Sequence, residues 1–95
     1  MGKQAARIGD FHKCTFVKPL PHIGGPILTG ASTVIICGQP AARVTDKARC
    51  KGPTDTITTG SATVLIERQL AARVGDRTAH GGVIITGAPT VLIGG

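Results

Sequence analysis

The chain has 95 residues, 41% of them hydrophobic, yet it contains only two Phe and neither Trp nor Tyr. A chain of this length buries only roughly 60–65% of the surface that it exposes when unfolded, so a thick two-layer core is not expected. Its formal net charge of +6 suits nucleic acid, an anionic membrane surface or an acidic protein, or simply a solvated basic surface. The sequence shows no apolar run typical of a secretory signal or a membrane span, so we expect neither.

Internal repetition is the main feature of the sequence. A block of the form x-A-A-R-[IV]-[GT]-D occurs three times, and a second block, rich in β-branched residues, follows each copy. The first block occupies residues 4–10, 40–46 and 70–76, and the second occupies residues 30–36, 60–66 and 87–93. The repeats divide one domain, residues 1–95, into units of about 4–38, 39–68 and 69–95.

Each unit is predicted to form short strands joined by turns, because its β-branched runs are bounded by Gly and Pro and no helical period persists. One unit of about 30 residues cannot bury its own apolar face, so the three are expected to share a core with pseudo-threefold symmetry. The Gly that opens each second block suggests a turn with positive φ. Cys37, which follows a β-branched run, is expected to be a small buried hydrophobe.

A metal site is suggested by the residues four positions after each repeated Asp, which are Cys14, Cys50 and His80. His12 and His22 add two further candidates, so five residues compete for the four positions of a closed zinc site. Repeat symmetry favours Cys14, Cys50 and His80 with His22. His12 and Cys14 are two residues apart and would point the same way on an extended segment, so either could bind.

An Arg precedes each repeated Asp by three residues, giving the pairs Arg7 and Asp10, Arg43 and Asp46, and Arg73 and Asp76. We favour a local turn in which the carboxylate accepts backbone or guanidinium hydrogen bonds. The alternative is a ring of Arg side chains that contacts a partner. Three equivalent carboxylates in three equivalent turns indicate architecture rather than catalysis, so no catalytic residue is assigned.

The sequence from Ala5 to Gly95 resembles the PAAR-repeat proteins, which are named for the motif that stands here as Pro40, Ala41, Ala42 and Arg43. The resemblance implies a conical, short-stranded β fold with one zinc ion at its narrow tip. The family's site is histidine-rich with one cysteine, which implies His12, His22, Cys50 and His80 as ligands, with Cys14 as the named substitute. Thr45, Leu70 and Gln4 depart from the usual motif, but the Ala-Ala-Arg-x-x-Asp frame is kept in all three copies.

The function implied by the resemblance is that of a structural tip of the type VI secretion spike. The protein would cap the VgrG trimer and sharpen the spike for piercing target membranes, and it could link effector proteins to the spike. It would contact the target membrane mechanically, bind no nucleic acid, and pass from the bacterial cytoplasm to the target cell on the spike. No fused effector is expected after Gly95. The alternatives are a small zinc-dependent nucleic-acid-binding module and a zinc hydrolase.

Overall fold

The fold consists of short strands joined by turns. A computed structural model describes residues 2–13, 24–50 and 54–94, and within these ranges the chain forms ten two-residue strands and no helix. The prediction of an all-β fold is confirmed. The strands are β1 (Lys3–Gln4), β2 (His12–Lys13), β3 (Ile35–Ile36), β4 (Gln39–Pro40), β5 (Lys47–Ala48), β6 (Asp55–Thr56), β7 (Leu65–Ile66), β8 (Gln69–Leu70), β9 (Val83–Ile84) and β10 (Leu92–Ile93).

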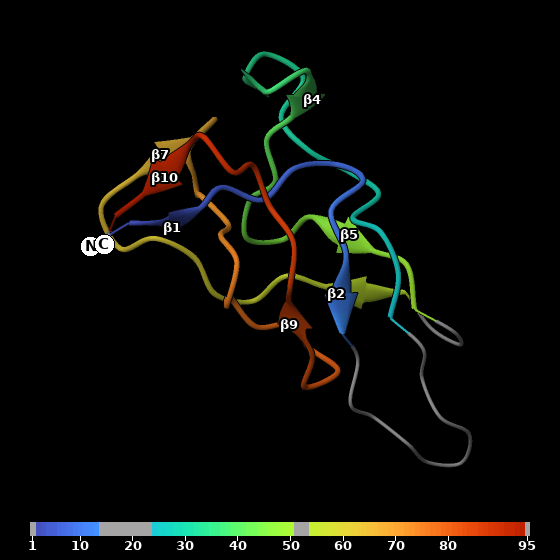
Figure 1. The fold of residues 1–95 in the computed structure, drawn as a ribbon. Coiled ribbons are helices and arrows are strands. Elements are labelled where there is room, and N and C mark those ends of the chain that lie inside the picture. Colours follow the sequence, from blue (N-terminus) through green and yellow to red (C-terminus); the bar gives the residue numbers. More distant parts are fainter. Residues whose placement is uncertain (1, 14–23, 51–53, 95) are drawn as a thin grey trace, which may run out of the picture.

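The strands pair in five antiparallel ladders that lie in two tiers. One tier contains β3–β4, β7–β8 and β1–β10, which pack on one core cluster, and the other contains β5–β6 and β2–β9, which pack on a second cluster. In the first tier two pairs are hairpins, whereas the third brings the two ends of the chain together (Figure 1). The three repeats therefore contribute three equivalent strand pairs. No turn connects β1 and β10, so noncovalent contacts alone hold this pair together.

The turn of the β3–β4 hairpin overturns one prediction. Cys37 is exposed rather than buried, because it is the first of two turn residues with positive φ, followed by Gly38. Two such residues are typical of the turns that match the twist of a two-residue hairpin. The β7–β8 hairpin has the same geometry at Glu67 and Arg68, with φ of 49° and 69°, but carries no glycine there.

A closed ring of backbone hydrogen bonds joins the three repeats at the centre of the molecule. The Ala6 N–H donates to the Ala72 carbonyl (3.0 Å), Ala72 donates to Ala42 (3.0 Å), and Ala42 donates to Ala6 (2.9 Å). These alanines are almost completely buried. A larger side chain would force the three segments apart, which explains why each copy carries Ala-Ala at this point. The ring confirms the predicted pseudo-threefold symmetry.

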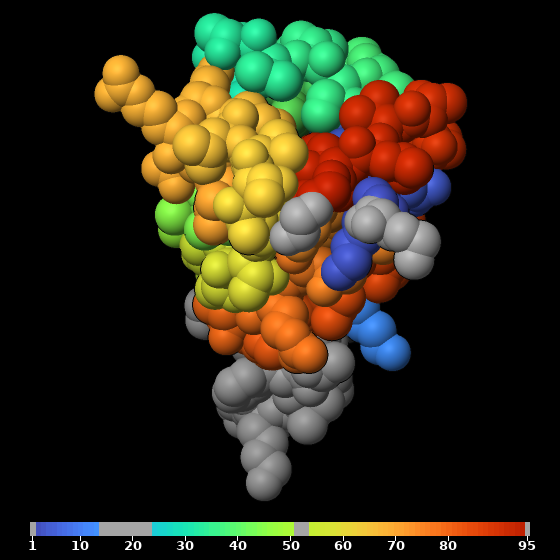
Figure 2. Space-filling model, turned by 90° about the vertical axis from the view of Figure 1, so that its left-hand side faces the viewer, coloured from blue at the N-terminus to red at the C-terminus, as the bar shows by residue number. Residues whose placement is uncertain are grey.

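The core is stacked in layers along this axis. The layers on one side of the ring contain the repeat-equivalent residues Ile36, Ile66 and Ile93 with Ala31 and Ala88, and those on the other side contain Ile27, Ile57 and Ile84. Figure 2 shows that the second blocks, near residues 32, 62 and 90, form the wide end of the molecule. The described part narrows toward the residues around position 80.

The glycines that open the second blocks have a different role from the one expected. Gly30, Gly60 and Gly87 do not have positive φ. A Cβ atom at any of them would instead lie 2.7 Å from a backbone carbonyl oxygen of a neighbouring unit, at Ala41, Ala71 and Ala5 respectively. Glycine is required here because two backbone segments approach closely.

Candidate functional site

The threefold pattern breaks in the layer beyond Ile27, Ile57 and Ile84, toward the narrow end. The positions two residues after the repeated Asp hold His12, Ala48 and Thr78, all buried. The positions two residues before the layer of isoleucines hold Gly25, Asp55 and Gly82. This layer therefore contains one imidazole and one carboxylate where the other units have small residues.

Asp55 is completely buried and organises this layer. Its Oδ1 atom accepts hydrogen bonds from the backbone N–H groups of Thr56 (2.8 Å) and His80 (3.0 Å). Its Oδ2 atom lies 3.2 Å from Nε2 of His12, whose side chain is also fully buried. Because β6 and β2 come from different repeats, Asp55 joins three segments that are distant in the sequence.

His12 has both ring nitrogens facing acceptors. Its Nδ1 atom lies 3.0 Å from the Gly25 carbonyl oxygen, and a carbonyl can only accept, so Nδ1 carries a proton. Nε2 of His12 and Oδ2 of Asp55 face each other without a well-aligned hydrogen bond within the described residues. Buried polar atoms without a hydrogen-bond partner are rare and mark stored strain, a functional role, or a bound water or ion.

Asp55 is held as a carboxylate. Burial by itself would raise its pKa, but hydrogen bonds from the Thr78 hydroxyl and from the His80 and Thr56 N–H groups outweigh that effect, aided by the charge of His80. The net result is a pKa below the ordinary value for Asp. The layer therefore holds a fixed negative charge next to two histidines.

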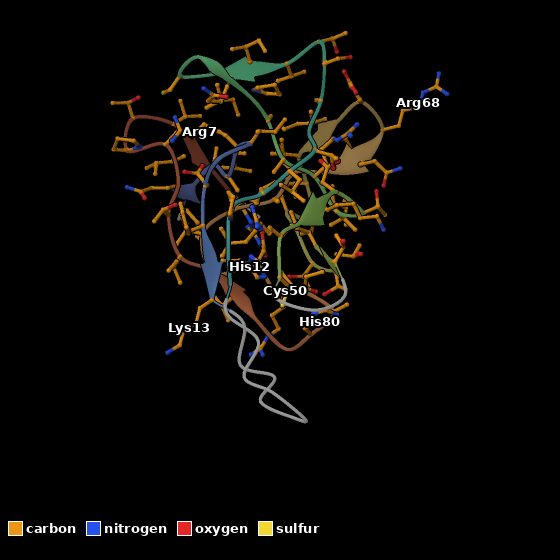
Figure 3. All side chains as sticks on the ribbon, turned by 90° about the vertical axis from the view of Figure 1, so that its right-hand side faces the viewer. Arg7, His12, Lys13, Cys50, Arg68 and His80 are labelled. Carbon is orange, nitrogen blue, oxygen red and sulfur yellow. The ribbon has the colours of Figure 1, made fainter. Side chains whose placement is uncertain are left out.

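Cys50 and His80 lie together just beyond this layer. Cys50 Sγ is 3.4 Å from His80 Nδ1, although the two residues are 30 positions apart in sequence. Figure 3 shows both side chains toward the narrow end, close to His12. They are two of the three residues that stand four positions after the repeated Asp. The third, Cys14, and the predicted ligand His22 lie outside the described residues.

The donor set fits zinc in part. Two ligands of a tetrahedral zinc ion, one sulfur at about 2.3 Å and one nitrogen at about 2.0 Å, are separated by about 3.5 Å, which matches the Cys50–His80 distance. No three His, Cys, Asp or Glu side chains among residues 2–13, 24–50 and 54–94 converge into a metal-binding group. His12 could bind a metal through Nε2 only by exchanging its contact with Asp55 for the ion.

The three Arg–Asp pairs form identical turns. In each, Asp Oδ2 accepts from both the backbone N–H and Nε of the Arg, and Oδ1 accepts from Nη2, with distances between 2.7 and 3.2 Å. A Thr of another segment also donates to each Asp: Thr86 to Asp10, Thr29 to Asp46 and Thr59 to Asp76. The hydrogen bonds to Asp10 and Asp46 raise the pKa of Arg7 and Arg43, despite their partial burial. The carboxylates are thus engaged in the scaffold.

Sequence reasoning missed Asp55. It lies outside both repeated blocks, and it is the only copy of its position that carries a side chain larger than hydrogen. That asymmetry is visible in an alignment of the three repeats, two residues before Ile27, Ile57 and Ile84. It would have identified Asp55 as a residue with a task that the other units do not share.

A family model described as the PAAR motif matches residues 17–86, which is most of the chain. The chain belongs to the PAAR-motif family. Members of this family are structural proteins associated with the tip of the type VI secretion spike. A search of curated proteins found no match. No helix in the described part of the chain is long and apolar enough to cross a membrane.

Proposed function

We propose that this PAAR-motif protein caps the trimeric VgrG spike protein, with one chain seated on three. The support is its pseudo-threefold body. A single chain whose three sides are alike can present the same contact to each subunit of a trimer. The ring of hydrogen bonds among Ala6, Ala42 and Ala72 makes the three sides rigidly equivalent, so one docking mode would be used three times.

The contacts are assigned to the free edges of β3, β7 and β10 at the wide end. In the β3–β4 hairpin the Ala41 N–H donates to the Val34 carbonyl (2.9 Å), so the backbone groups of Ile35, the next residue, point away from β4. Leu65 and Leu92 occupy the same position in β7 and β10, beside the equivalent bonds from Ala71 to Val64 and from Ala5 to Val91. Exposed strand edges of this kind pair readily with strands of a partner.

An apolar side chain marks each edge. Ile35, Leu65 and Leu92 are 57%, 62% and 62% exposed, which is unusual for large aliphatic residues in three equivalent places. Their strand neighbours Ile36, Ile66 and Ile93 point into the core. A threefold partner that ends in three strands would cover the aliphatic side chains and satisfy the backbone groups together.

We further propose that one structural zinc ion closes the narrow end. Cys50 and His80 would supply two ligands, and the remaining two would come from His12, His22 and Cys14. A crosslink of this kind suits a tapering end, which has little interior to fill, and zinc binding adds to folding free energy. The chain's own contribution is the Asp55 layer, which fixes the backbone of His80 beside Cys50.

The test is native mass spectrometry of the protein mixed with the VgrG trimer of the same genome. We expect one chain and one zinc ion per trimer. Ile35→Glu, Leu65→Glu and Leu92→Glu combined should abolish the complex, whereas the control pair Leu28→Glu and Ile85→Glu, exposed outside the three edges, should leave it intact. A wild-type protein that stays monomeric beside the trimer would overturn the proposal.

The zinc assignment has its own test in metal content per chain, measured for single alanine variants. Cys50→Ala and His80→Ala should both lose the ion. Comparison of His12→Ala with Cys14→Ala then decides which of the two completes the site, since only the true ligand is needed. Unchanged zinc content in both the Cys50 and the His80 variant would refute the site.

A further inference from the structure

We call the part of the molecule between the ring of alanines and the narrow end the narrow half. Every carboxylate side chain of the protein is either buried and bound to other groups or lies away from this half. Asp10, Asp46 and Asp76 are buried against their Arg partners, and Asp55 is fully buried. Glu67, in the turn of the β7–β8 hairpin at the wide end, binds Thr33 and Arg43. These are all five acidic residues of the protein. The narrow half therefore presents no exposed carboxylate.

Cations in the same region are exposed and unopposed by carboxylates. Lys13 lies in β2, Lys47 begins β5 with Arg49 two residues later, and Arg77 follows Asp76. Each stands one or three residues after a repeated Asp, so the repeats distribute these cations around the body rather than on one face. Figure 3 shows Lys13 projecting outward near the narrow end. The Lys47 ammonium donates only to the Thr56 hydroxyl among the described residues (3.1 Å).

Large apolar side chains stand among these cations. Phe11, Leu28 and Ile85 are each about half exposed. Backbone hydrogen bonds set Leu28 beside Lys47 (2.7 Å) and Ile85 beside Phe11 (2.9 Å). Exposed apolar and cationic residues therefore occur together in the narrow half. We call the seven residues Phe11, Lys13, Leu28, Lys47, Arg49, Arg77 and Ile85 the belt.

We propose that the belt binds the headgroup region of an anionic lipid bilayer. Its cations would face lipid phosphates while Phe11, Leu28 and Ile85 enter the boundary with the acyl chains, the arrangement that interfacial proteins use. Charge complementarity supports this occupant, since the belt carries four cations and the described chain sets no exposed carboxylate among them. A belt that encircles a tapering body suits a surface that closes around it. A linear polyanion would reach one side only, and Phe11 is the only described aromatic that could stack on a base.

The experiment is co-sedimentation of the intact protein with vesicles of phosphatidylcholine alone or mixed with about one third phosphatidylglycerol. We expect binding only to the anionic vesicles, weakened by added salt. Each neutralised belt cation should lower the partition coefficient about fivefold, which is about 1 kcal/mol per Lys or Arg near an anionic surface. Lys13→Gln, Lys47→Gln, Arg49→Gln and Arg77→Gln combined should thus lower it by about several hundredfold. Phe11→Ser should weaken binding without changing the salt dependence.

The matched control is Lys3→Gln with Arg68→Gln, which neutralises two cations outside the belt, in β1 and in the β7–β8 turn. If the control and the belt variants lose vesicle binding equally for each charge removed, net charge alone attracts the protein and the proposal is overturned. Equal binding to neutral vesicles, or no vesicle binding by a folded wild type that binds duplex DNA at the same salt, would also overturn it. Because the belt leaves the β3, β7 and β10 edges free, the VgrG-bound protein should bind vesicles too. The outcome is thereby independent of the capping test.

Discussion

Replacement of Asp55 by Ala tests the central layer of the narrow end. The change would leave the fully buried His12 ring without its counter-group and would strand the backbone N–H groups of Thr56 and His80. Each buried hydrogen-bonding group left without its partner costs about 1–3 kcal/mol, so Asp55→Ala should lose about 3 kcal/mol or more. Asp55→Asn keeps an acceptor at the Oδ1 position, so it should cost less, about 1–2 kcal/mol.

The assay is urea unfolding in the presence of a chelator, so that metal binding does not enter the measured free energy. A double-mutant cycle with His12→Ala isolates the interaction between the two side chains, because residues in direct contact are not additive. We expect a coupling above about 1 kcal/mol. The reasoning is refuted if Asp55→Ala loses less than about 1 kcal/mol, or if the two substitutions are additive.

Three further predictions concern the same scaffold. Gly60→Ala should destabilise the fold by about 1–3 kcal/mol in urea unfolding, because its Cβ would lie 2.7 Å from the Ala71 carbonyl oxygen. The control Gly94→Ala, whose Cβ would meet no atom within 4 Å, should be nearly neutral. Equal effects of the two substitutions would contradict the close-approach argument. Arg68→Gly should stabilise the protein by up to about 1 kcal/mol, because Arg68 has φ of 69° where the equivalent β3–β4 turn has Gly38. A loss of stability would contradict this, because it would show that a contact of the Arg68 side chain outweighs the backbone strain. Asp55, whose pKa is lowered on folding, contributes stability that is present above its unfolded pKa of about 4 and is lost as the pH falls through the folded value. The stability difference between wild type and Asp55→Asn should therefore shrink below about pH 4, and a constant difference across that range would exclude an ionised Asp55.

The threefold fold could be predicted from the sequence because the information is repeated. Ala5-Ala6, Ala41-Ala42 and Ala71-Ala72 recur in one frame, and a unit too small to bury its own apolar face must share a core with its copies. The β-branched runs then indicate strands rather than helices. The same frame predicted that the residues four positions after each Asp approach one another, and the structure places Cys50 and His80 3.4 Å apart.

Two predictions, one about Cys37 and one about the glycines that open the second blocks, were wrong for a shared reason. Cys37 looked like the end of a buried strand, and Gly60 like a turn residue with positive φ. Cys37 instead stands in a hairpin turn, and Gly60 makes room for the carbonyl of Ala71. Both depend on which other segment lies alongside, and local sequence does not contain that information.

The sequence by itself determined the strands, the repeat units and the symmetry that joins them, because these follow from patterns that are written three times. The tertiary structure alone decided what the residue that breaks the symmetry does. Asp55 occurs once, between residues with no motif, and its role depends on its contacts with His12 and His80, which lie 43 and 25 positions away in the chain. Only folding removes water from these three groups and makes each dependent on the others, since a carboxylate in an unfolded chain is solvated and needs no partner.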